Sequence, residues 1–207
     1  MYNIYICYVD IDPMYKLHKL YRLLAYWVLA PLIAWPMIAL ALISHRLKNE
    51  ITQAALVISR VPFHVGERAR YLFYRRLLIS VGADVTFRYG AFFQYRKARV
   101  GNRVLIGYFN TIGEVDIGDH VLIGGNVNLL SGMEQHGFHD PDRLIWDTPG
   151  KGRRVIKIGS DVWIGSNSVI GDDVGSRCVV ATGSVVTKPI PDHSLVGGVP
   201  AKFIKNI

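Results

Sequence analysis

From Val100 onward the chain repeats a unit of six residues, and this period constrains the fold more than any other feature. Segments such as VGNRVL, IGDHVL and IGSDVW begin with an aliphatic residue, continue with glycine and then turn polar; Ile158, Ile164 and Ile170 mark three successive units. A period of six matches neither the 2.0 of an isolated strand nor the 3.6 of a helix. It predicts a mainly β solenoid with triangular coils of three short parallel strands, in which the aliphatic residue points inward and Gly, Asn or Asp turns the corner.

The repeat is broken at three places. The step from Ile112 to Ile117 is five residues and the step from Ile170 to Val174 is four, so we expect a shortened turn at each. The third break is longer: residues 131–154, SGMEQHGFHDPDRLIWDTPGKGRR, contain no unit at all. We expect this segment to leave the solenoid wall as a loop.

The N-terminal region has a different character. Residues 23–44, LLAYWVLAPLIAWPMIALALIS, carry no charge, and 22 residues of helix could cross a hydrocarbon core of ~30 Å. Pro31 and Pro36 favour a kink. Basic residues flank the segment on both sides, which fits a hairpin that enters and leaves on one face; they are Lys16, Lys19, Arg22, Arg46 and Lys48. We expect residues 1–50 to insert in a membrane in a re-entrant or monotopic manner. A single kinked span is the second choice and a buried core helix the third.

Residues 51–81 form a basic linker. The stretch GERARYLFYRRLLISVG interleaves arginines, Arg70 among them, with aromatic residues and leucines, as in an amphipathic helix on anionic headgroups; the same pattern fits a helix that caps the repeat domain. The formal charge of +8 suits nucleic acid, an anionic membrane or a phosphorylated small molecule. No recognised nucleic-acid-binding module accompanies this charge, so we do not expect nucleic acid as a partner. Cys7 and Cys178 match no metal spacing and fit a reducing cytoplasm.

The repeats resemble the hexapeptide-repeat, left-handed parallel β-helix acyltransferases over roughly residues 82–207. IGSDVWIGSNSVI, VVATGSVVTKPIP and GGVPAKFIK resemble the galactoside and maltose O-acetyltransferase branch, and VPFHVGERARYLFYRRLLISVGADV is similar to polysaccharide-biosynthesis O-acetyltransferases of the colanic acid type. The resemblance implies acetyl-CoA as cosubstrate without a metal. It also implies a homotrimer with clefts between neighbouring solenoids, and acetyl transfer to a sugar hydroxyl of a surface-polysaccharide or lipid-linked precursor.

The loop carries the candidate catalytic residues. A sugar hydroxyl is scarcely ionised near pH 7, so a neutral imidazole that takes its proton is useful. In HGFHDPD, His136 matches the family's catalytic histidine as general base, and His139 matches a second position that supports the loop or the acceptor. Glu134 stands where many relatives have an earlier histidine, as an orienting carboxylate or a bystander. Asn110 in YFNT corresponds to an asparagine that contacts acceptor and acyl group; otherwise it turns a solenoid corner.

For coenzyme A, small residues would let the pantetheine arm lie along the wall and lysines would meet the phosphates. The residues that the resemblance nominates are Trp163, Gly165, Ser166, Thr182, Gly183, Thr187, Lys188, Lys202 and Lys205. Packing within the solenoid is the other interpretation of Trp163, and a solvated turn that of Lys188.

Three other functions stay open at this point. An amino sugar is an alternative acceptor, which would make the enzyme an N-acetyltransferase. A zinc hydratase of the hexapeptide carbonic anhydrase type would use His120, His136 and His139, although that family's histidine spacing is missing. A non-catalytic scaffold would keep the fold alone. The leading expectation is an O-acetyltransferase at the cytoplasmic face of the inner membrane, because acetyl-CoA is cytosolic and both basic flanks would face it; its acceptor is a lipid-linked or nucleotide-linked sugar.

Overall fold

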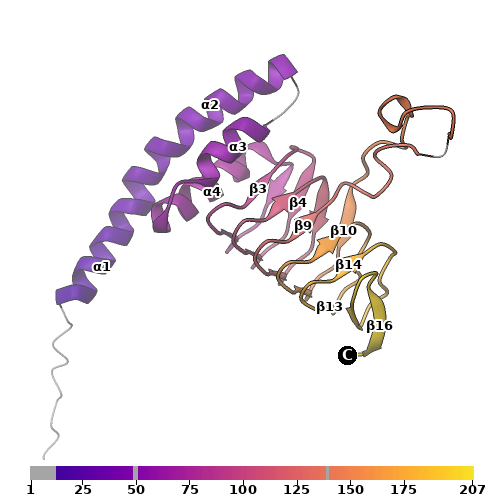
Figure 1. Ribbon diagram of the computed structural model, residues 1–207. Helices are drawn as coiled ribbons and strands as arrows, with labels where there is room; N and C mark the ends of the chain where they lie inside the picture. Colours follow the sequence, from indigo (N-terminus) through magenta and orange to yellow (C-terminus); the bar gives the residue numbers. More distant parts are fainter. Residues whose placement is uncertain (1–12, 49–50, 139) are drawn as a thin grey trace, which may run out of the picture.

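The computed structural model describes residues 13–48, 51–138 and 140–207. Helices at the N-terminal end lead into a solenoid that carries most of the chain, and the C-terminus lies at the opposite end of the solenoid (Figure 1). The helices are α1 (Pro13–Leu24), the π-helical turn η1 (Ala25–Leu29), α2 (Ala30–Lys48), α3 (Thr52–Ser59) and α4 (Phe63–Leu77).

The solenoid has three sheets, here called A, B and C, through which the chain passes in that order in each coil before the last. Sheet A contains β1 (Ser80–Val81), β4 (Ala98–Val100), β7 (Val115–Ile117) and β10 (Ile156–Ile158). Sheet B contains β2 (Thr86–Phe87), β5 (Leu105–Ile106), β8 (Leu122–Ile123), β11 (Trp163–Ile164), β13 (Val179–Val180), β15 (Ser194–Gly197) and β16 (Lys202–Asn206). Sheet C contains β3 (Phe92–Phe93), β6 (Thr111–Ile112), β9 (Asn128–Leu129), β12 (Val169–Ile170) and β14 (Val185–Val186).

Equivalent positions of successive coils stack in register. In sheet B, Ile123, Ile164 and Val180 are parallel partners, and all three are buried. Each such side chain contributes about 1.5–3 kcal/mol by leaving water. All these strand pairs are parallel except the last, β15 with β16. The predicted parallel β-solenoid of hexapeptide repeats is therefore confirmed.

The two short breaks in the repeat lie at the same corner. The five-residue step after Ile112 joins a strand of sheet C to β7 of sheet A, and the four-residue step after Ile170 joins one to Val174, a single residue bridged to Ile158 of sheet A. This C–A corner therefore has the shortened turns that the spacing predicted. The A–B and B–C corners instead contain residues with left-handed backbone, such as His120 with a φ of 60° and Asn126 with 55°.

The long N-terminal helix differs from the expected hairpin. The chain runs from Pro13 to Lys48 without a reversal, with Pro36 inside α2. A π-helical turn directly precedes Pro31: the amide of Ala30 donates to the carbonyl of Ala25, five residues earlier. This wider turn explains how the helix accommodates Pro31. Residues 19–43 form one helix long and apolar enough to cross a membrane by length and composition.

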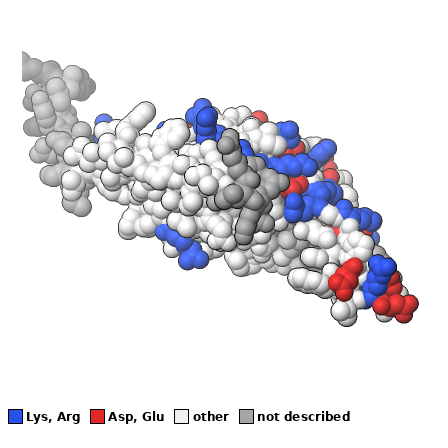
Figure 2. Space-filling view, turned by 90° about the horizontal axis from the view of Figure 1, so that it is seen from above, with Lys and Arg blue, Asp and Glu red and all other residues white. Residues whose placement is uncertain are grey.

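An alanine stripe fixes this helix to the rest of the molecule. Ala30, Ala34 and Ala41 are fully buried, and α2 packs on α3 and α4. The side chains of Trp27 and Trp35, on other faces, are 73% and 60% exposed. The surface along the helix is almost free of charged side chains (Figure 2). One side of the helix is therefore a protein contact, and much of the remainder is an exposed apolar surface.

Helix α4 caps the first coil. Tyr74 is buried against Phe87 and Phe93, with ring centroids 4.9 and 5.0 Å away. Arg70 does not belong to the basic surface that the amphipathic pattern suggested: it is fully buried and donates to the carbonyls of Phe87 (2.9 Å) and Val61 (2.7 Å). Burial lowers the pKa of this guanidinium. Arg70 thus ties the helix to the solenoid.

Candidate functional site

Residues 131–154 leave the C–A corner between β9 and β10 and project away from the wall (Figure 1). The two arms of this loop are hydrogen-bonded to each other. The amide of Arg154 donates to the Ser131 carbonyl (3.0 Å), and that of Lys151 to the Glu134 carbonyl (2.9 Å). Farther out, the amide of Gly137 donates to the Thr148 carbonyl (3.3 Å). Backbone hydrogen bonds therefore hold the two arms of the loop together, beginning where the loop leaves the solenoid.

Glu134 contributes to this pairing. Its carboxylate forms an ion pair with the Lys151 ammonium at 2.8 Å, and both side chains are more than half exposed. Two glycines allow the arms to approach: a Cβ on Gly150 would lie 2.7 Å from the Glu134 carbonyl oxygen, and one on Gly137 would lie 2.7 Å from Cγ2 of Thr148. In this structure Glu134 bridges the arms.

His136 lies on the first arm, opposite Pro149, and lines a cavity of about 570 Å³ at the base of the loop. The other lining residues come from the solenoid corner and from the second arm; they are Tyr95, Lys97, Glu114, Gln135, Gly152 and Arg153. The cavity is therefore lined by an imidazole together with a group of charged residues.

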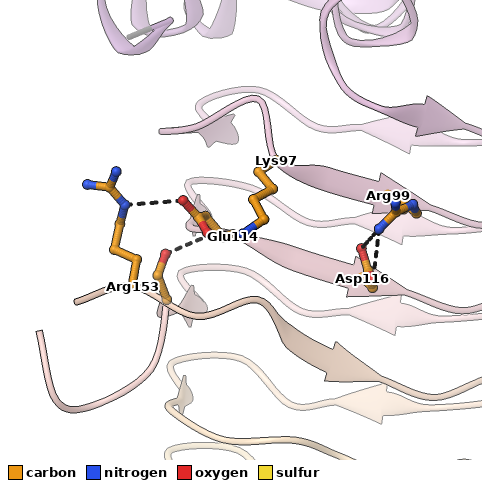
Figure 3. A network of polar contacts seen from close by, with 6 residues as sticks. Lys97, Arg99, Glu114, Asp116 and Arg153 are labelled. Atoms are coloured by element: carbon orange, nitrogen blue, oxygen red, sulfur yellow. Dashed lines mark hydrogen bonds and ion pairs between the residues drawn. The ribbon is translucent and has the colours of Figure 1, made fainter. Parts of the chain in front are cut away.

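Glu114 is the centre of this charged group (Figure 3). Its side chain is only 9% exposed, and its carboxylate lies 3.2 Å from Nε of Arg153 and 3.6 Å from Nζ of Lys97. Its backbone amide donates to the Ser131 hydroxyl (2.8 Å) at the start of the loop. Glu114 therefore connects the solenoid to both arms.

The guanidinium of Arg153 is held from two sides. Besides its bond to Glu114, it lies 4.2 Å from the ring centroid of Tyr95, within cation–π range. Burial opposes its charge, but the hydrogen bond to Glu114 leaves the pKa of Arg153 above its ordinary value. Neither Glu114 nor Arg153 was predicted from the sequence. The available signal was a glutamate at the five-residue slip, where the repeat gives no reason for one.

Asn110 is fully buried in the turn before β6. Its amide donates to the Gly124 carbonyl (2.9 Å), and its Oδ1 accepts from the Val127 amide (2.6 Å). Both groups of the side chain are thus bonded to the next coil. This geometry favours the structural interpretation of Asn110 over contact with an acceptor.

The residues nominated for coenzyme A fall into two groups. Gly165, Ser166, Thr182 and Gly183 stack at the B–C corner, where the Gly183 amide donates to the Ser166 carbonyl (2.9 Å). Lys202 and Lys205 are exposed on β16 of the adjoining sheet B. Thr187 and Lys188 instead follow β14 at the C–A corner, the corner that carries the loop. Sheet C separates the two groups within one chain.

The first group fits an extended chain such as the pantetheine arm. A Cβ on Gly183 would meet nothing within 4 Å, so the corner is open there. Trp163 on β11 is 55% exposed beside a shallow cavity of about 200 Å³ that Leu122 and Val179 also line. The Ser166 hydroxyl accepts a hydrogen bond from the Gly125 amide (3.1 Å), so it also holds two coils together.

The histidines of the zinc alternative are not brought to one place. His120 lies at an A–B corner, and His136 lies on the loop at the C–A corner. His139 lies outside the described residues. Within the described ranges, no group of three His, Cys, Asp or Glu side chains is arranged to hold a metal ion.

A parallel β-helix of hexapeptide units, interrupted by one histidine-bearing loop, is the arrangement that the resemblance to the hexapeptide-repeat acyltransferases led us to expect. Residues 155–188 match the family model described as the hexapeptide repeat of succinyl-transferase. Over 170 residues the chain is 32% identical to galactoside O-acetyltransferase of Escherichia coli K12, spanning 79% of this chain and 73% of that one. It belongs to the hexapeptide-repeat acetyltransferases, in the galactoside and maltose O-acetyltransferase branch.

Solved structures agree with this assignment. A hexapeptide-repeat acetyltransferase of Vibrio cholerae, complexed with acetyl coenzyme A, is 29% identical with a TM-score of 0.63, covering 74% of this chain and 84% of that one. A galactoside acetyltransferase in complex with coenzyme A is 28% identical with a TM-score of 0.65, covering 81% and 82%. Membership of the family therefore rests on sequence and fold together.

Proposed function

We propose that the chain transfers the acetyl group of acetyl-CoA to a hydroxyl of a sugar in a surface-polysaccharide or lipid-linked glycan precursor. The observation that carries the proposal is His136, held on paired arms and lining a cavity of about 570 Å³. The names of the relatives support the reaction class: one is a galactoside O-acetyltransferase, and solved structures of two contain coenzyme A or its acetyl ester.

In this mechanism His136 acts as general base. The neutral imidazole takes the proton of the acceptor hydroxyl as its oxygen attacks the thioester carbonyl, and it returns a proton to the departing sulfur when the carbon–sulfur bond breaks. The pairing of the arms restricts the position of the imidazole, which is what an oriented base requires.

The cavity wall suits an acceptor with a negative group. Lys97 and Arg153 bring two positive charges and Glu114 one negative charge, so the wall has a net positive charge. Arg153 is 48% exposed and presents part of its guanidinium to solvent. A sugar linked to a nucleotide or to a lipid carries phosphate, which such a wall attracts.

We further propose a homotrimer. His136 and Lys188 lie at the C–A corner, whereas the Ser166–Thr182 column lies at the B–C corner of the same chain. A neighbouring copy that presents its B–C corner to this loop would bring the two groups to one cleft.

The location that we propose is the cytoplasmic face of the membrane, where acetyl-CoA is available. The apolar helix surface with the exposed Trp27 and Trp35 supports insertion, and the docking of α2 on α3 and α4 along its alanine stripe favours a monotopic position over a free-standing span.

The test compares His136→Ala with a matched variant, His193→Asn, which changes an exposed histidine just before β15 to a residue that tolerates its positive φ. Detergent-purified or membrane-embedded protein receives labelled acetyl-CoA and candidate lipid-linked and nucleotide-linked glycans. Mass spectrometry locates the acetyl group, and mild alkali distinguishes an ester from an amide. His136→Ala should bind coenzyme A normally and lose transfer about 10²–10⁴-fold. Full activity in this variant refutes the assignment of the base.

A further inference from the structure

A second cavity, of about 430 Å³, lies at the other end of the molecule, between the long N-terminal helix, α4 and the first coil. Tyr26 of η1 forms one wall, Arg68 and Tyr71 of α4 form another, and residues 83–86 of the first coil form the third. It shares no lining residue with the His136 cavity. We call it the Arg68 cavity.

The Arg68 side chain lies against two aromatic rings, and one of its donors has no hydrogen-bond partner among the described residues. Its guanidinium carbon lies 5.7 Å from the ring centroid of Tyr26 and 5.2 Å from that of Tyr71. Its Nε is buried and has no hydrogen-bond partner among the residues that the structure describes. A buried donor without a partner costs free energy, so its presence points to an acceptor that binds there. Aromatic contacts of this kind leave the in-plane N–H groups of a guanidinium available to such an acceptor.

The charges around the cavity favour an anion. Arg22 also lies over the Tyr26 ring (5.9 Å), and Arg75 over the Tyr71 ring (5.8 Å). Of the two carboxylates that line the cavity, Glu67 is paired with Arg88 at 2.6 Å, whereas Asp84 is exposed and has no ion pair within the described part of the chain. One arginine therefore lines the cavity and two more lie against its aromatic walls, whereas one lining carboxylate has no ion pair among the described residues.

The neighbouring surface indicates where the anion comes from. Trp27 follows Tyr26 directly and is 73% exposed, and Leu23, one turn earlier, is 49% exposed. Both belong to the apolar surface of the long helix. A phosphate in the cavity would thus have apolar surface beside it, which suits acyl chains.

We propose that the Arg68 cavity binds the phosphate group of a membrane phospholipid. Arg68 donates in-plane hydrogen bonds to the phosphate oxygens, Arg22 and Arg75 add positive charge, and the acyl chains lie along the apolar helix. The site would set the depth and orientation of the solenoid at the bilayer surface. It takes no part in acetyl transfer, and it rests on the membrane location proposed above but not on the proposed reaction.

Native mass spectrometry of the full chain in a nonionic detergent, with phosphatidylglycerol added at low mole fraction, tests the site. Arg68→Gln removes the charge, and Ala83→Trp fills the cavity without changing any charge. Arg76→Gln is the matched control, because Arg76 is exposed on the same helix and does not line the cavity. Wild type and Arg76→Gln should retain one bound lipid. In both cavity variants the ratio of lipid-bound to lipid-free protein should be at least tenfold lower.

Equal lipid loss from Arg68→Gln and Arg76→Gln overturns the proposal, because general attraction to basic residues would then explain the binding. Unchanged retention in Ala83→Trp overturns it as well. A parallel thermal-shift titration with glycerol 3-phosphate distinguishes the source of the phosphate: no stabilisation at millimolar concentration supports a lipid ligand, and binding as tight as that of the lipid refutes it. Thermal unfolding of each variant, with a midpoint near that of wild type, shows that loss of lipid is not loss of fold.

Discussion

Gly150 is the position where a single methyl group should separate the arms of the loop. Its Cβ would lie 2.7 Å from the Glu134 carbonyl oxygen and closer still to that of Gln135, while ordinary contact begins at 3.4 Å. Because the obstacle is backbone, and the Gln135 carbonyl oxygen is the nearest atom, the arms of a Gly150→Ala protein must move apart by about 1 Å. That displacement acts on the arm that carries His136.

A misplacement of about 1 Å at a reacting group can cost about 10²-fold in rate. We therefore expect Gly150→Ala to lower kcat/KM for acetyl transfer by roughly 10- to 100-fold, mostly through kcat. The unfolding transition of the solenoid should stay close to that of wild type, because the loop projects outside the stacked coils (Figure 1).

Asp142 provides the control on the same loop. Its side chain is exposed and does not line the His136 cavity, so Asp142→Ala changes the loop without changing the spacing of the arms. Steady-state transfer with a thiol-release assay, using an acceptor that wild type accepts, compares the two variants. Gly150→Ala with activity equal to wild type, or an Asp142→Ala protein that loses as much, would refute the reasoning that arm spacing positions the base.

Three further predictions concern stability. Asn110→Ala leaves the Gly124 carbonyl and the Val127 amide without their partner, so its free energy of unfolding in urea should fall by about 2 kcal/mol or more. Burial would raise the pKa of Asp173, but hydrogen bonds from Arg154 and the Lys157 amide hold this pKa below its ordinary value. The ionised carboxylate therefore stabilises the folded state above the unfolded pKa of about 3.9, and this stabilisation is lost as pH falls through the folded pKa. The stability difference between wild type and Asp173→Asn should therefore shrink on acidification below about pH 4. Ala34→Leu overpacks the helix contact by about 1–3 kcal/mol and should expose the N-terminal helix to protease, whereas Ala39→Leu, at an exposed position, should not.

The repeat determined most of what the sequence could predict. The aliphatic residue of each unit identified the buried positions, and the two short steps in the spacing correctly indicated shortened turns, which both lie at the C–A corner. The 24-residue interruption predicted the loop on which His136 lies. These signals are local, because a coil's inward residue and its corner lie within six residues of each other.

The features that sequence reasoning missed depend on partners that are distant in the chain. Arg70 fits a solvated basic face by its spacing, but the carbonyl of Phe87 lies 17 residues away and accepts its hydrogen bond inside the fold. Glu114 and Arg153 are 39 residues apart and meet only because the loop returns to its starting corner. The two basic flanks of residues 23–44 suggested a hairpin, whereas the helix runs on from Pro13 to Lys48 and packs on α3 and α4, which follow it in the chain.

The two-corner arrangement follows from the solenoid itself. The B–C corner of a coil, where Ser166 lies, and its C–A corner, where Lys188 lies, are about six residues apart, and six extended residues span about 20 Å. Stacking further coils lengthens the row of residues at each corner but does not bring the two rows together. A loop could cross that distance on its own chain, yet residues 131–154 point away from the wall (Figure 1). For a rigid solenoid, a second copy is then the direct way to place the open corner of Gly183 opposite His136. Mixing His136→Ala with Gly183→Trp protein tests this. The mixture should recover part of the activity that each variant lacks, since some clefts would combine an intact loop from one chain with an intact corner from another. An activity equal to the sum of the two separate variants would place the whole site on one chain.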